Sequence, residues 1–173
     1  MKMITSFLLF FFLYACGNSE PNAEVPEAEA RQVTTIYLVR HAEKEAGEDP
    51  PLTPAGQQRA QRLRDKLSGQ SLAAIYSTDT RRTRATAEPT ATAQQLPIQE
   101  YDGTQLSDLA ERLKQEHNGQ TVLVIGHSNT TPALANLLVG SQELTDFDED
   151  DYGNLLIVTV KKGGGAQVQT NRY

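Results

Sequence analysis

The sequence predicts an α/β fold, a three-layer sandwich in which a mostly parallel sheet carries helices on both faces and an antiparallel hairpin at one edge. Short apolar runs rich in β-branched residues, which are typical of buried parallel strands, alternate with segments of helical pattern. Such alternation favours a parallel sheet covered by helices. The last two strand-like runs flank residues 161–165, whose three glycines suit a tight turn between antiparallel strands.

Each element has a local signal in the sequence. The first helix is expected to follow Thr53, a capping residue, with Pro54 at its first position. A later helix carries Leu106, Leu109 and Leu113 on one face. The expected helices are residues 54–67, 80–94, 104–116 and 131–138. The expected strands are residues 33–39, 72–76, 121–125, 155–160 and 166–172, with one further short segment at 97–101.

Length and composition limit the classes of function. The 173 residues suit one domain with a single sizeable core. The net charge of -6 and the lack of a basic stripe argue against a nucleic-acid partner. The acidic run 146–151 does not fit an EF-hand, because the sixth and twelfth positions counted from Asp146 are Asp151 and Ile157. With one cysteine and three scattered histidines, no metal site is expected.

The N-terminal region has the pattern of a targeting signal. Lys2 precedes an apolar stretch, residues 4–14, which is too short to span a bilayer but suits a signal segment. Residues 13–17 resemble the lipobox of bacterial lipoproteins, so Cys16 would be acylated; an ordinary secretory signal with a chance cysteine is the alternative. We therefore expect a signal peptide at 1–15, a lipidated cysteine and flexible tether at 16–32, and the folded domain at 33–173, anchored in the bacterial cell envelope and facing the periplasm or exterior.

Two histidines follow two of the expected strands. His41 comes after the apolar run at 36–39 with Arg40 before it, and His127 comes after the run at 122–126. An open α/β sheet binds its ligands just outside the carboxyl ends of its strands. Both imidazoles are therefore expected in one cleft.

Four stretches in this order resemble the motifs of the histidine phosphatase superfamily, the phosphoglycerate mutase-like enzymes. They are LVRHAEK at 38–44, LTPAGQQRA at 52–60, IYSTDTRRTRATA at 75–87 and VIGHSN at 124–129. The similarity spans roughly residues 33 to 160. The pairs His41-Ala42 and His127-Ser128, together with the short chain, resemble the small single-domain phosphatases of this superfamily rather than its phytase and acid phosphatase branch.

The resemblance implies roles for individual residues. His41 would be the phosphoryl-accepting nucleophile, with Arg40, Arg82 and His127 around the transferring group. Planar guanidinium groups suit phosphate oxygens. Alignment to the family pattern selects Arg82, four residues before Thr86, over its neighbours Arg81 and Arg84. Glu43 and Ser128, next to the two histidines in sequence, are further candidates for substrate binding.

The proton donor to the leaving oxygen is expected between the second arginine motif and the second histidine. Asp102 is the preferred candidate, and Glu100 and Glu43 are the alternatives. Two other features are expected to be structural: His117 as a surface cap at a helix end, and residues 146–151 as a solvated loop bordering the cleft.

Together, these expectations describe a phosphomonoesterase that works through a phosphohistidine, without a cofactor, on the outer side of the cytoplasmic membrane. Its partners would be a small phosphorylated substrate or a phosphoprotein, and the membrane through Cys16. The alternatives are a phosphoryl-binding module without turnover, a phosphohistidine or phosphoprotein phosphatase, and a mutase-type phosphotransferase of the same superfamily.

Overall fold

A computed structural model describes residues 33–173 of the chain. The expected signal peptide, Cys16 and the expected tether lie outside these residues. Within them, no helix has both the length and the apolar character that crossing a bilayer requires.

Six strands form one sheet, in the order β3-β2-β4-β1-β5-β6. The strands are β1 (Val33–Arg40), β2 (Leu72–Ser77), β3 (Ile98–Glu100), β4 (Thr121–Gly126), β5 (Asn154–Lys161) and β6 (Ala166–Arg172). The four strands from β3 to β1 run parallel, whereas β5 pairs antiparallel with both β1 and β6. The predicted parallel sheet with an antiparallel edge hairpin is confirmed.

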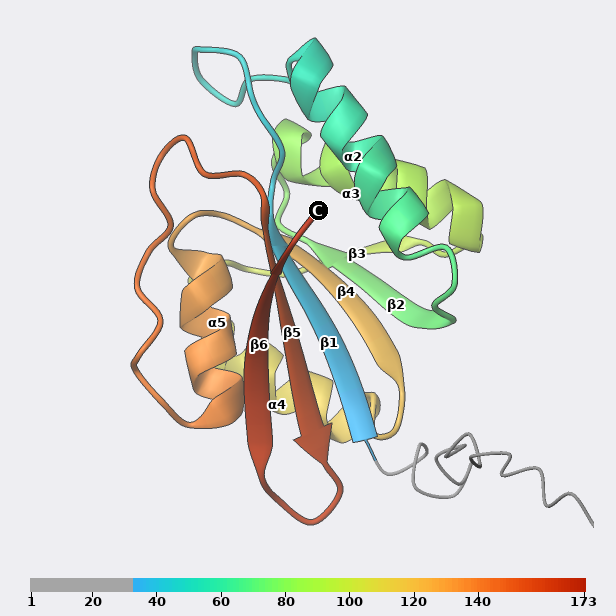
Figure 1. Cartoon of the computed structure of the whole chain (residues 1–173), viewed down its shortest axis with the longest axis vertical. Coiled ribbons are helices and arrows are strands. Elements are labelled where there is room, and N and C mark those ends of the chain that lie inside the picture. The colour runs from blue at the N-terminus through green and yellow to red at the C-terminus, as the bar shows by residue number, and fades with distance from the viewer. Residues whose placement is uncertain (1–32) are drawn as a thin grey trace, which may run out of the picture.

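Four helices cover the two faces of this sheet (Figure 1). They are α2 (Pro54–Lys66), α3 (Arg81–Gln94), α4 (Leu106–Glu116) and α5 (Thr130–Val139). Side chains of β1 alternate between the faces: Ile36 and Leu38 pack with Leu113 and Leu134 of α4 and α5, whereas Val39 packs with the helices of the other face. The core therefore lies in two layers on either side of the central strands.

Local chemistry sets where the helices begin. Thr53 and Thr80 cap α2 and α3, and each hydroxyl accepts a bond from a backbone N–H three residues later. Helix α4 starts at Leu106 rather than at the expected 104. The reason is that the backbone N–H and hydroxyl of Thr104 donate to the Asp102 carboxylate, which closes a local turn before the helix.

His117 is not the surface residue that the sequence suggested. It ends α4 as expected, but its side chain is buried. Its Nε2 lies 2.8 Å from the hydroxyl of Tyr76, a fully buried residue of β2, and its Nδ1 lies 2.9 Å from Oε1 of Gln120. A buried phenol needs a hydrogen-bond partner. The imidazole of His117 is buried because it is the partner of the Tyr76 hydroxyl.

Candidate active site

The two strand-end histidines meet at one end of the sheet. In the parallel pair β1 and β4, Arg40 stands opposite Gly126, and the backbone N–H of His41 donates to the carbonyl of Gly126 over 2.9 Å. The next residue on each strand is therefore a histidine, at the same edge. The rings of His41 and His127 lie 5.5 Å apart between centroids, edge to face at 70°. The juxtaposition expected from the strand ends is present.

The imidazole of His41 is buried, neutral and fixed in one tautomer. Its Nδ1 lies 2.8 Å from the carbonyl oxygen of Ala42, which can only accept, so Nδ1 carries the proton and Nε2 carries the lone pair. Burial lowers the pKa of His41 to about 3, and the nearby charges of Arg40 and Arg82 act in the same direction. At neutral pH the ring is therefore an uncharged nitrogen nucleophile.

The second histidine is held at both nitrogens. Its Nδ1 lies 3.4 Å from Nη2 of Arg82, and its Nε2 lies 2.9 Å from Oγ1 of Thr78. Because a guanidinium can only donate, Nδ1 accepts and Nε2–H donates to Thr78, whose hydroxyl donates onward to Thr83. Burial, then Arg82 and Arg40, lower the pKa of His127 to about 4. The sequence analysis did not single out Thr78 and Thr83, although both lie inside its second arginine motif.

Arg40 is almost completely buried, with 2% of its surface exposed. Its Nη1 donates to the backbone carbonyl of Asp148 over 2.8 Å, and its guanidinium lies 4.2 Å above the ring of Tyr152. That ring also lies 6.0 Å from His41, between centroids. The loop at 146–151 is solvated and borders the cleft as expected, and its backbone also binds Arg40.

The second motif contributes Arg82 to this site and not its neighbours. Arg82 contacts His127, whereas the recorded polar contact of Arg81 is through its backbone and Arg84 faces Asp79 at the surface. The hydroxyl of Thr86 donates to the carbonyl of Arg82 over 2.7 Å and accepts from the N–H of Ala42 over 2.9 Å. Thr86 therefore ties helix α3 to the residue that orients His41.

Within the described part of the chain, two guanidinium groups of the site have N–H donors without partners, which favours the binding of an anion. Among the described residues, the Nε atoms of Arg40 and Arg82 are buried and have no hydrogen-bond partner. Buried guanidinium donors without partners are unfavourable unless a ligand completes them. An anion such as phosphate, bound beside these guanidinium groups, would supply acceptors for them.

The structure does not bring the preferred proton donor to the histidine pair. Asp102 is exposed, and its Oδ1 accepts from the N–H and hydroxyl of Thr104, bonds that lower its pKa. It lines a small hollow that includes Glu100 but neither of the two site histidines, although the neighbouring Gly103 lies close to Thr78. As placed here, Asp102 has no contact with the attacking nitrogen, and its role as the acid stays a prediction.

Glu43 and Ser128 lie beside the site in different ways. The carboxylate of Glu43 is paired with the guanidinium of Arg59, with Nη2 2.6 Å and Nε 2.9 Å from its oxygens, and this bonding lowers the pKa of Glu43. It is therefore poorly suited to donate a proton near neutral pH. Arg59 also donates to the carbonyl of Tyr173, which links the last residue of the chain to the first motif. The carbonyl of Ser128 accepts from the N–H of Phe147 and joins the acidic loop to the second histidine.

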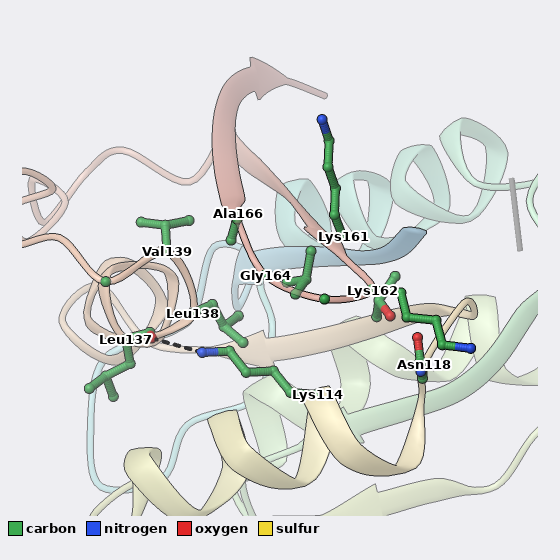
Figure 2. A pocket seen from close by; sticks show the side chains of 14 residues that line it. Lys114, Asn118, Leu137, Leu138, Val139, Lys161, Lys162, Gly164 and Ala166 are labelled. Atoms are coloured by element: carbon green, nitrogen blue, oxygen red, sulfur yellow. Dashed lines mark hydrogen bonds between the residues drawn. The ribbon is translucent and has the colours of Figure 1, made fainter. Parts of the chain in front are cut away.

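A second hollow lies at the opposite end of the sheet (Figure 2). It is lined by the start of β1, the end of α5 and the glycine turn between β5 and β6. Its titratable groups are Lys114, Lys161 and Lys162, and the Lys114 ammonium lies 3.4 Å from the carbonyl of Leu137. None of the predicted site residues lies there.

The comparisons with known proteins agree with this geometry. The model of the histidine phosphatase superfamily (branch 1) matches residues 36–105, which include His41, Arg40 and Arg82. Over these residues the chain is similar to the histidine phosphatase superfamily. None of the curated proteins compared with it matches.

Several solved structures share the fold of this chain. YhfR of Bacillus stearothermophilus matches at a TM-score of 0.66 and 21% identity, covering 80% of this chain and 96% of that one. The alpha-ribazole phosphatase of Shigella flexneri matches at 0.67 and 16%, with 80% and 96% covered. The protein histidine phosphatase SixA, in a complex with tungstate, matches at 0.64 and 19%, again covering 80% and 96%. At these identities the likeness establishes the fold alone.

Proposed function

We propose that this chain is a member of the histidine phosphatase superfamily, a phosphomonoesterase that hydrolyses phosphate esters through a phosphohistidine on His41. The match of residues 36–105 to the model of that superfamily supports a phosphatase or mutase-type activity. One observation carries the finer proposal: His41 is neutral, its Nδ1 is fixed on Ala42, and the lone pair of Nε2 is free beside two guanidinium groups with unused donors. A binding site alone would not need a buried, uncharged nucleophile among those charges.

The reaction follows from these positions in two displacements. The Nε2 lone pair of His41 attacks phosphorus, the N–P bond forms, and the ester P–O bond breaks with its electrons going to the leaving oxygen, which takes up a proton. Water then attacks phosphorus, the N–P bond breaks and inorganic phosphate leaves. Arg40 and Arg82 stabilise the charge on the equatorial oxygens in both steps. Because Nδ1–H is held by Ala42, the ring does not turn during the attack.

Trapping of the phosphoenzyme tests this proposal. The protein would be mixed with an aryl phosphate and quenched quickly in base, which preserves a phosphohistidine, and then mapped by mass spectrometry. We expect release of phosphate and a phosphorylated His41, with the His41→Ala variant as the blank. Binding of phosphate without release from any ester would instead favour a phosphoryl-binding module. Selective release from a phosphohistidine protein would favour a protein phosphatase, and transfer to a second alcohol a mutase-type enzyme.

The leaving-group proton is tested at Asp102. A general acid matters for an alkoxide leaving group and little for a nitrophenolate. If Asp102 is the acid, Asp102→Asn should slow hydrolysis of alkyl phosphates by roughly 10² and spare nitrophenyl phosphate. Equal changes on both substrates would give Asp102 a turn-forming role through Thr104. In that case Glu100→Gln and Glu43→Gln are the next variants to compare.

We further propose that the enzyme works outside the cytoplasm on a lipid anchor at Cys16. The support is the signal-like pattern of residues 2–17 with its single cysteine. Several acyl chains anchor a protein stably where one binds only marginally. Intact-mass measurement of the membrane fraction should find an acylated chain beginning at Cys16. A Cys16→Ser protein that is processed and retained like the wild type would contradict this proposal.

A further inference from the structure

The entrance to the phosphate site is acidic on two sides. Glu149 lies in the connection from α5 to β5, and Asp49 lies in the connection from β1 to α2. Figure 1 shows that both connections reach the end of the sheet at which β1 ends. Each contacts one of the two site arginines: Glu149 Oε2 is 3.4 Å from Arg40 Nη2, and Asp49 Oδ1 is 3.5 Å from Arg82 Nη1. Two distant loops thus each place a carboxylate against the phosphate-binding pair.

These carboxylates remain available to a ligand. The side chain of Glu149 is 90% exposed and that of Asp49 is 46% exposed, and both ion pairs are long. Exposed pairs of this kind hold their partners weakly. Asp49 is nevertheless fixed in place, because the same oxygen accepts the N–H of Arg81 at the start of α3 over 3.0 Å.

The arginines face inward while the acids face the solvent. Only 2% of the surface of Arg40 is exposed. Its Nη1 donates to the carbonyl of Asp148, and its Nε has no hydrogen-bond partner among residues 33–173. Arg82 contacts His127, whose ring centroid lies 5.5 Å from that of His41, and Arg40 and His41 both lie against the ring of Tyr152. A phosphoryl group on His41 would therefore lie next to both guanidinium groups. Because the leaving oxygen departs opposite the attacking nitrogen, and His41 is buried, the leaving group extends outward past Glu149 and Asp49.

We propose that this site selects phosphate monoesters whose leaving group carries a positive charge close to the phosphate, such as an amino or quaternary ammonium alcohol, and disfavours those with a second anion. This inference rests on the proposed phosphatase function. The phosphate is neutralised by Arg40 and Arg82, whereas the neighbouring group meets two carboxylates. Opposite charges at contact distance attract and like charges repel. The two carboxylates of Glu149 and Asp49, which form the rim of the site, therefore favour substrates with a positively charged leaving group over those with a negatively charged one.

The test compares a cationic ester with a neutral ester of the same shape and with an anionic ester. Phosphocholine is set against 3,3-dimethylbutyl phosphate, in which carbon replaces the charged nitrogen, and against 3-phosphoglycerate, which carries a second anion. For the wild-type chain at low salt we expect kcat/KM for phosphocholine to exceed that for the neutral ester by roughly tenfold, about threefold to fivefold for each acid. Added salt should reduce this ratio, because the rim is exposed.

Variants assign the preference to the two carboxylates. Glu149→Gln should reduce the ratio by about threefold to fivefold, and Glu149→Gln with Asp49→Asn should bring it near one. Glu143→Gln is the matched control: it removes one exposed charge from the same α5–β5 connection without any recorded contact to Arg40, and it should leave the ratio unchanged. Glu149 lies at the surface, so its single variant remains informative even if the double variant folds poorly.

Three results would overturn the inference alone. They are equal rates for the charged and neutral esters in the wild type, a ratio that survives in the double variant, and an equal gain on both esters when the acids are neutralised, which would mean that they only compete for the arginines. Failure of the wild type to release phosphate from any ester, nitrophenyl phosphate included, would instead overturn the proposed function, and the inference with it.

Discussion

Two buried histidines of this protein, His41 and His117, show how burial can serve chemistry or structure. His117 has a hydrogen-bond partner at each ring nitrogen, the hydroxyl of Tyr76 and the amide oxygen of Gln120. Within residues 33–173, His41 has a hydrogen-bond partner only at Nδ1, and the Nε atoms of the two nearby arginines have none. A satisfied imidazole stabilises a fold, whereas unused hydrogen-bonding capacity on several neighbouring groups indicates a binding site. His127 is intermediate, since both its nitrogens are engaged but one partner is Arg82.

The largest expected effect is a loss of turnover when the nucleophile, His41, is replaced. His41→Ala should lower kcat by on the order of 10³ or more, the scale seen when a covalent nucleophile is removed, while thermal unfolding stays cooperative. Steady-state kinetics on an aryl phosphate, with circular dichroism to check the fold, would measure both. Vanadate should inhibit the wild type, and EDTA should not. Near-normal turnover in His41→Ala would remove His41 from the mechanism.

The next effect concerns the groups around the phosphate. Arg40→Ala, Arg82→Ala and His127→Ala should each lower kcat by roughly 10² to 10³, because the two arginines are preorganised donors to developing charge and His127 holds the guanidinium of Arg82. Arg81→Ala and Arg84→Ala serve as matched controls from the same helix and should stay near wild type, since neither side chain has a recorded contact with the histidine pair. A silent Arg82→Ala beside a damaging Arg81→Ala would contradict the placement of Arg82.

A stability effect without loss of chemistry is expected at His117. His117→Ala leaves the Tyr76 hydroxyl buried without its partner, which costs about 1 to 3 kcal/mol of the free energy of unfolding. Urea denaturation would measure this loss, and kcat per folded molecule should be unchanged. The variant Tyr76→Phe removes the other partner and should leave turnover similarly intact. A catalytic defect in His117→Ala at full stability would place this residue in the mechanism.

The last effect is a dependence of stability on pH. The folded-state pKa values of His41 and His127, about 3 and about 4, lie below the ordinary value near 6.5. The unfolded chain therefore binds more protons between these limits, so stability is highest above about pH 6.5 and falls as the pH drops toward 4 and then 3. Urea denaturation from pH 7 to pH 4 should show this decline, and a variant with both histidines replaced by alanine should show a shallower one. Parallel curves would contradict the burial of two neutral rings.

Local patterns were sufficient for the elements of the fold because each rests on neighbouring residues. The apolar run of β1, the capping threonines and the glycine turn are all visible in short windows of sequence, and the structure has the strands and helices within a residue or two of the expected bounds. His117 shows the limit of such reading. Its position at a helix end was right, but its partner Tyr76 is 41 residues away, so its burial has no local signal.

The sequence by itself determined the parallel sheet with its edge hairpin, and the meeting of His41 with His127 at its carboxyl end. The strands and their ends follow from the apolar runs, and ligand sites lie at the carboxyl ends of strands in α/β sheets. Only the tertiary structure decided what surrounds those rings. The Asp148 carbonyl on Arg40 spans 108 positions of the chain, and the Thr78 hydroxyl on His127 spans 49. Loops have no sequence periodicity from which such contacts could be predicted. The contacts form only when packing of the core brings the loops to one end of the sheet.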